Sequence, residues 1–122
     1  MIKGVHTMFY TSQPEDLRAF IKDKLGFHRH ADVGEGWLIF ACPEADMGCH
    51  PSSDVEGGRS GTHQISFYCD DIKGTVAELK SKGVKFTEEI SNRGYGLTTR
   101  FALPGNFTAE LYQPLYERSY TE

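Results

Sequence analysis

Apolar residues recur at helical spacing in two segments of the chain, and each segment follows a run rich in β-forming residues. In residues 5–27, such a run is followed by a turn and then by an expected helix. Ser12 and Glu15 have the spacing of a capping box, which predicts the start of that helix. Pro14 stands where a missing N–H costs little, and Gly26 marks the expected end. The apolar face of this helix consists of Leu17, Phe20, Ile21 and Leu25.

The same plan returns in residues 62–84. Asp70 or Asp71 is the expected N-cap of the second helix, and Gly83 is its expected end. The apolar face of this second helix consists of Ile72, Val76 and Leu79. The chain is therefore predicted to contain an internal repeat.

The segments that follow the two helices also match one another. Residues 37–43 and 97–104 both end in Phe-Ala-x-Pro, and short runs closing in proline follow at 47–51 and 110–114. We expect one α+β domain, built as tandem βαβββ repeats that pair into a concave, partly open mixed sheet with two helices on the outside. The expected parts are module one at about 3–51, a polar, glycine-rich linker at about 52–61, module two at about 62–115 and a C-terminal tail at 116–122.

The composition narrows the possible partners. The chain has 122 residues, 39% of them hydrophobic, and a formal net charge of −4. Its longest apolar run, Trp37 to Cys42, is far shorter than the roughly 20 residues that span a bilayer. The acidic balance argues against nucleic-acid binding, which needs clustered Lys and Arg. Three cysteines without a CxxC pair are expected to be reduced, as in a cytoplasmic protein. We therefore expect a cytoplasmic domain that acts on a small molecule or a protein partner, with no nucleic-acid or membrane partner.

Several motifs give the chain a family resemblance. They are VHTMFY followed by LGF, CDDI leading into the second helix, and PGNFTAELYQP. With the tandem βαβββ plan, the chain resembles the vicinal oxygen chelate superfamily, which includes glyoxalase I, extradiol dioxygenases and bleomycin resistance proteins. The resemblance implies a divalent metal ion (Fe, Mn, Ni or Zn) held by the opening and closing strands of both units, where a substrate with two neighbouring oxygens can chelate it.

The resemblance implies specific metal ligands in this sequence. His6 on the first opening strand and Glu110 on the last closing strand match the family pattern, and a ligand carboxylate such as Glu110 would also move a proton in catalysis. Met47 occupies the closing-strand position of the first unit, where a thioether is a poor ligand. His50, three residues later, is a further candidate for binding the metal ion or the substrate if the chain bends there.

The fourth ligand position has two candidates. His63 stands as far from His6 as Gly83 does from Gly26, which selects it by the repeat. Strand alternation favours Gln64 instead, because an apolar set facing the helix turns the other residues toward the cavity. The apolar set is Ile65, Phe67 and Cys69, and the residues turned toward the cavity are Gln64, Ser66 and Tyr68. A β-bulge would restore His63, so both remain candidates.

Four further residues are candidates for binding the substrate. Trp37 and Tyr112 could line the pocket, and Tyr95 lies in a glycine-containing loop that could act as a flap. Arg100 lies within an expected strand and could pair with a substrate carboxylate.

Three hypotheses for function follow. The first is a metal-dependent lyase, isomerase or ring-cleaving dioxygenase acting on vicinal oxygens. The second is a metal-free protein that binds a small molecule or antibiotic, favoured by Met47 in place of a carboxylate. The third is a degenerate scaffold whose function lies in dimerisation, and a homodimer is expected in any case because βαβββ units expose sheet edges.

Overall fold

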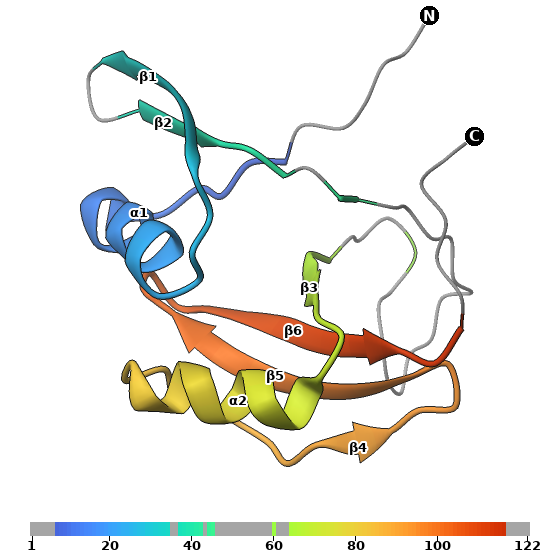
Figure 1. Ribbon diagram of the computed structural model, residues 1–122. Coiled ribbons are helices and arrows are strands. Elements are labelled where there is room, and N and C mark those ends of the chain that lie inside the picture. The colour runs from blue at the N-terminus through green and yellow to red at the C-terminus, as the bar shows by residue number, and fades with distance from the viewer. Residues whose placement is uncertain (1–6, 35–36, 43, 46–59, 61–63, 117–122) are drawn as a thin grey trace, which may run out of the picture.

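The computed structural model describes residues 7–34, 37–42, 44–45, 60 and 64–116 of the chain (Figure 1). The described residues form two helices and six strands, which confirms the predicted α+β class. In chain order these are α1 (Pro14–Asp23), β1 (Arg29–Gly34), β2 (Trp37–Phe40), β3 (Ser66–Tyr68), α2 (Ile72–Ser81), β4 (Ser91–Asn92), β5 (Gly96–Leu103) and β6 (Phe107–Pro114). Neither helix, nor any other in the described part of the chain, is long and apolar enough to cross a membrane.

Helix α2 begins and ends where the sequence predicted. The side chain of Asp71 accepts a hydrogen bond from the Gly74 N–H at 3.2 Å, which satisfies one of the free donors of the first turn. Gly83 follows the helix with a φ of 87°, a conformation that suits glycine. The residues of α2 that are buried are Ile72, Val76 and Leu79, as predicted.

Helix α1 corrects one detail of the sequence analysis. Pro14 is its first residue, so Gln13 occupies the N-cap and makes no side-chain capping bond. The predicted capping box of Ser12 and Glu15 is therefore wrong, because the helix begins one residue later than that box requires. The Gln13 N–H instead donates to the Thr11 hydroxyl at 2.9 Å, just before the helix.

The larger sheet has the strand order β3-β6-β5-β4. Strand β3 runs parallel to β6, whereas the β6-β5 and β5-β4 pairs are antiparallel. In this register Ser66 of β3 and Arg100 of β5 both lie opposite Glu110 of β6. With α2 between β3 and β4, the second unit has the predicted βαβββ order.

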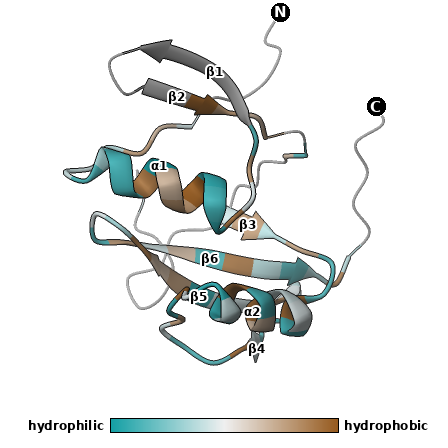
Figure 2. Cartoon of the chain, turned by 60° about the vertical axis from the view of Figure 1, so that its left-hand side comes forward, coloured by the Kyte–Doolittle hydropathy of each residue, from teal (hydrophilic) through white to brown (hydrophobic). Residues whose placement is uncertain are grey.

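The first unit is described in part. Strands β1 and β2 form an antiparallel pair, and α1 lies between this hairpin and the larger sheet in Figures 1 and 2. Residues 7–13 form no strand, so the described part of the predicted opening strand is not found. The predicted closing strand at 47–51 and the predicted linker up to residue 59 lie outside the described residues.

Both helices pack into one core with a single face of the larger sheet. Phe101 of β5 lies at its centre with no exposed surface, and its ring contacts three other rings. Phe20 of α1 stacks on it with ring centroids 6.4 Å apart. We call the sheet side that meets the helices the covered face, and its residues in this core include Phe67, Phe101, Leu103, Ala109 and Leu111.

Candidate functional site

The other side of the larger sheet carries polar and aromatic side chains. Side chains alternate along a strand, so the residues between those of the covered face point the opposite way. We call this side the polar face, and its residues on the two paired strands β3 and β6 include Ser66, Tyr68, Glu110 and Tyr112. All four side chains are half-buried, which leaves them in reach of a molecule from solvent.

Glu110 is the centre of a hydrogen-bonded group on the polar face. Its Oε2 accepts a bond from the Ser66 hydroxyl at 2.6 Å and another from the Gln64 Nε2 at 3.2 Å. The short Ser66 bond is of the length expected when a hydroxyl donates to a carboxylate. The parallel register of β3 and β6 creates this contact, because it places Ser66 directly opposite Glu110.

Four tyrosines lie next to this carboxylate group. The Tyr112 ring lies 6.4 Å from that of Tyr68 and 6.5 Å from that of Tyr95, measured between centroids. The Tyr112 and Tyr116 hydroxyls are 3.2 Å apart. We call Tyr68, Tyr95, Tyr112 and Tyr116 the tyrosine cluster. Tyr95 and Tyr116 are each 49% exposed, so the cluster has an accessible aromatic edge.

The charge of Glu110 acts on the tyrosine cluster. Burial raises the pKa of the Tyr95 phenol above its ordinary value, and the negative charge of Glu110 raises it further. The positive charge of Arg93 opposes these effects, with a smaller influence than Glu110. The Tyr95 side chain therefore stays a neutral phenol that can donate a hydrogen bond.

A cavity of about 260 Å³ opens beside the cluster. Tyr68 and Tyr116 line it together with two acidic residues, Glu44 and Asp70. The Tyr68 hydroxyl donates a hydrogen bond to the Glu44 carboxylate, which links the first unit to the polar face. Cys69, which follows β3, also lines the cavity.

The structure brings together four of the residues singled out in the sequence, namely Gln64, Tyr95, Glu110 and Tyr112. Arg100 lies opposite Glu110 in the sheet, but its guanidinium donates to the Thr108 carbonyl and hydroxyl, the latter at 2.9 Å. Trp37 begins β2 in the smaller sheet.

The remaining candidates of the sequence analysis lie outside the described residues. They are His6, Met47, His50 and His63. The choice between His63 and Gln64 as a metal ligand thus stays a prediction.

Two residues of this region were missed in the sequence. Tyr116 follows Tyr112 by four positions, so the alternation of β6, continued past the strand end, would have placed both on one face. Glu44 had no such signal, because it meets Tyr68 through tertiary contact between segments 24 residues apart.

The donors around Glu110 test whether the described residues fit the metal ion that the resemblance implies. Fe, Ni and Zn sites are built from His, Cys and carboxylate ligands. No group of three such residues occurs within the described ranges. Next to Glu110 stand an amide and a hydroxyl, and both donate hydrogen bonds to its Oε2. The described residues alone therefore do not form a metal site.

The sequence matches the model of the Glyoxalase/Bleomycin resistance protein/Dioxygenase superfamily over residues 3–111. The chain belongs to this superfamily, as its motifs predicted.

Among curated proteins, the uncharacterized protein YetH of Bacillus subtilis is 30% identical over 83% of this chain and 90% of its own length. A 3-dehydroshikimate dehydratase of Pseudomonas putida is 41% identical over 57% of this chain, a match that spans 11% of that protein.

Solved structures share the fold. TnmS3, an antibiotic binding protein from Streptomyces sp. CB03234, is 22% identical over 93% of this chain and 99% of its own, with a TM-score of 0.65. Lactoylglutathione lyase from Agrobacterium tumefaciens is 16% identical over 88% of this chain and 90% of its own, with a TM-score of 0.61. At these identities the likeness is one of fold, and it includes both a binding protein and an enzyme.

Proposed function

We propose that the protein binds a small aromatic molecule on the polar face of the larger sheet, without a resident metal ion. The observation that carries this proposal is the tyrosine cluster standing beside the Glu110 carboxylate. Aromatic rings supply large, rigid contact surfaces, and a few polar groups fix the orientation of a ligand. The fold shared with the antibiotic binding protein TnmS3 is consistent with this function.

The tyrosines would supply the apolar contact. Tyr95 meets Tyr112 edge to face at 69°, and the Tyr68 ring is tilted by 52° to that of Tyr112, so the rings do not stack flat on one another. Such rings leave faces and edges for a further ring, and each aromatic pair adds about 0.5–1.5 kcal/mol beyond the area buried. A ligand ring that completes this arrangement would gain contacts with more than one tyrosine.

Glu110 would supply the polar anchor. Its Oε2 is held by Ser66 and Gln64, which fixes the carboxylate in place. Within the described ranges, Oε1 has no hydrogen-bond partner, so it is the oxygen that a ligand donor would meet. A preorganised acceptor costs little ordering entropy when the ligand binds.

Replacing a cluster tyrosine tests the proposal. A panel of aromatic compounds would be titrated against the protein by calorimetry, and each binding compound repeated with Tyr112→Leu and Tyr112→Phe. We expect Leu to abolish or strongly weaken binding and Phe, which keeps the ring, to weaken it much less. Tyr10→Leu is the matched control, because Tyr10 is 85% exposed and makes no contact with the cluster. Equal binding by Tyr112→Leu and the unchanged protein would overturn the proposal.

One observation favours a second function, that of a metal-dependent enzyme acting on vicinal oxygens as a lyase, isomerase or dioxygenase. Gln64, next to an opening strand, touches Glu110 on a closing strand, where the family resemblance predicts ligands. His6 or His63 would have to complete that set. Metal analysis after supplementation with zinc, nickel, manganese and anaerobic iron separates the two functions. Stoichiometric metal that is lost in both His6→Ala and Glu110→Ala would favour the enzyme over the metal-free protein.

Assembly and location belong to the same proposal. We infer a homodimer, because β3 and β4 are the edges of the larger sheet among the described strands and edge strands present unpaired N–H and C=O groups. Sedimentation would give the mass of two chains if this is right.

We infer a cytoplasmic location from the cysteines, of which Cys42 and Cys69 are free thiols.

A further inference from the structure

The charges around the tyrosine cluster point to the chemical class of the ligand. We propose that the polar face binds an aromatic organic cation, such as an amine or quaternary ammonium group attached to a ring. This inference rests on the proposed binding function and specifies it further. It is carried by the contacts of Glu110 and by the side chains that line the adjacent cavity.

The carboxylate of Glu110 forms no ion pair within the described part of the chain. The two groups that donate to it, the Ser66 hydroxyl and the Gln64 amide, are both neutral. Arg100 is its cross-strand neighbour, yet the guanidinium bonds to Thr108 and forms no ion pair with Glu110. A half-buried carboxylate without an ion-pair partner favours a ligand that brings a positive charge or a strong donor.

The cavity beside the cluster has the same sign of charge. The charged side chains that line it are both acidic, Glu44 and Asp70, and they share this lining with Tyr68 and Tyr116 of the tyrosine cluster. Glu44 bonds to Tyr68, and the charge of Glu110 acts on Tyr95, so carboxylates reach two different members of the tyrosine cluster. Arg93 is a positive charge near Tyr95, but it acts on that phenol less strongly than Glu110 does. The carboxylates therefore repel an anionic ligand and attract a cation.

The tyrosine rings add a second interaction that is specific for cations. A ligand cation within about 6 Å of an aromatic ring centre is attracted to the negative face of the ring, and the effect grows when the group is desolvated. The cluster thus combines the two features that hold an ammonium group, which are aromatic faces and carboxylates. A neutral ring of the same size would use the apolar contact and at most a hydrogen bond, without the attraction of a positive charge to the carboxylates and rings.

Three probes of one ring and different charge test the inference by isothermal calorimetry. They are benzyltrimethylammonium, benzyl alcohol and phenylmethanesulfonate. We expect the cation to bind about tenfold or more tightly than the neutral and anionic probes, and its affinity to fall as sodium chloride is raised. Equal or tighter binding of the alcohol or the sulfonate would overturn the cation class and leave the proposed binding function standing. If none of the three binds, the binding function itself fails.

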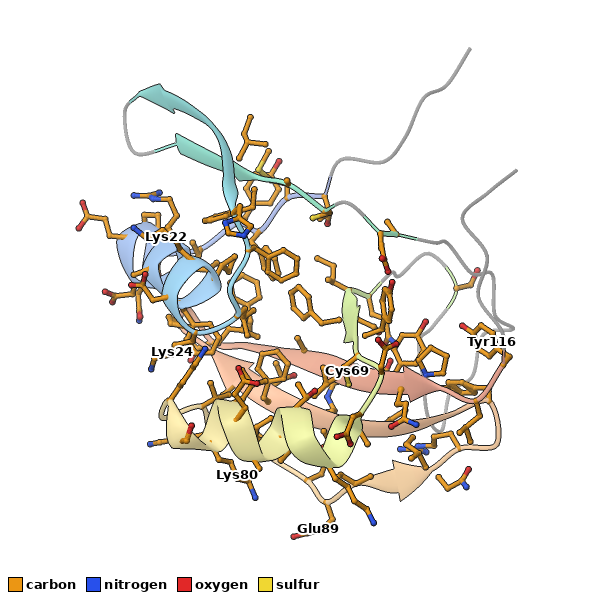
Figure 3. All side chains as sticks on the ribbon, in the orientation of Figure 1. Lys22, Lys24, Cys69, Lys80, Glu89 and Tyr116 are labelled. Atoms are coloured by element: carbon orange, nitrogen blue, oxygen red, sulfur yellow. The ribbon has the colours of Figure 1, made fainter. Side chains whose placement is uncertain are left out.

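A charge-neutral replacement locates the effect. Glu110→Gln keeps an oxygen that can accept from Ser66, so the variant is expected to fold, and a thermal melt checks this. We expect it to weaken benzyltrimethylammonium by about tenfold and benzyl alcohol by less than twofold. Glu89→Gln is the matched control, because Glu89 is exposed and lies well away from Tyr116 and Cys69 in Figure 3. An equal loss of both probes in Glu110→Gln would contradict the inference.

Discussion

The two faces of the larger sheet are made by the same strands and differ by one step of alternation. On the covered face, Phe101 and Leu111 are buried against the two helices. Glu110 and Tyr112 are the two sequence neighbours of Leu111, yet they point to the polar face. There they form a hydrogen-bonded and aromatic site. The comparison indicates that stability and binding are encoded in alternate positions of the same segments. Substitutions on the two faces should therefore change different properties.

The largest expected effect is on the covered face. Phe101→Ala removes a ring that has no exposed surface and contacts the rings of Phe20, Phe67 and Phe86. We expect a loss of about 3–5 kcal/mol in the free energy of unfolding, measured by denaturant titration, because a large cavity remains. Tyr112→Phe on the polar face, by contrast, should lose less than about 1 kcal/mol. Similar losses in the two variants would contradict the division between the faces.

An intermediate effect on stability is expected at the turn that joins β5 to β6, the two paired strands that contribute to both faces. Gly105 has a φ of 95° in the loop between β5 and β6, and an added Cβ would collide with the Thr11 side chain of the first unit. Gly105→Ala should cost about 1–3 kcal/mol in unfolding free energy. Gly94→Ala is the matched control, since Gly94 has a φ of 89° and open space around it. A cost in Gly105→Ala no larger than in the control would exclude a role for the Thr11 contact.

The smallest expected effect is on a phenol of the polar face. Burial and the Glu110 charge both raise the pKa of Tyr95, so removal of the charge in Glu110→Gln should lower that pKa while the effect of burial remains. A carboxylate disfavours a second negative charge nearby, which gives the direction of the change. Titration of the tyrosine ring resonances by NMR measures it, and Glu89→Gln should leave the Tyr95 pKa unchanged. An unchanged pKa in Glu110→Gln would mean that the two groups do not interact.

The sequence predicted local structure well where one segment contains all the information. The Asp71 cap, the buried face of α2 and the stop at Gly83 depend on neighbours within one helix. The capping box at Ser12 was wrong because helix boundaries shift by one residue easily, and Pro14 as first helical residue decided the boundary here. The prediction that Ser66 and Tyr68 point away from the helices was also confirmed, because the alternation of side chains depends only on strand geometry.

The contacts of the site depended on pairings that single segments do not encode. Residues 44 positions apart meet in the Ser66–Glu110 bond, and the parallel register that joins them follows from the packed sheet. Arg100 was a candidate partner of a substrate carboxylate, and this role stays a prediction; the sequence did not indicate that the hydroxyl and carbonyl of Thr108 engage its guanidinium across the hairpin. Likewise, the cavity beside Tyr68 includes Glu44, which only tertiary folding brings there.

The most direct test of the account is a map of where an aromatic molecule binds. Amide chemical shifts of the labelled protein would be followed by NMR while benzyltrimethylammonium, or whichever of the three probes binds most tightly, is added. We predict that the largest shifts fall on the strands of the polar face, around Ser66, Tyr68, Glu110 and Tyr112, and that the outer residues of α1 and α2 move little. Shifts confined to the helices, or no saturable shifts with any of the three probes, would contradict the claim that the polar face is the binding site.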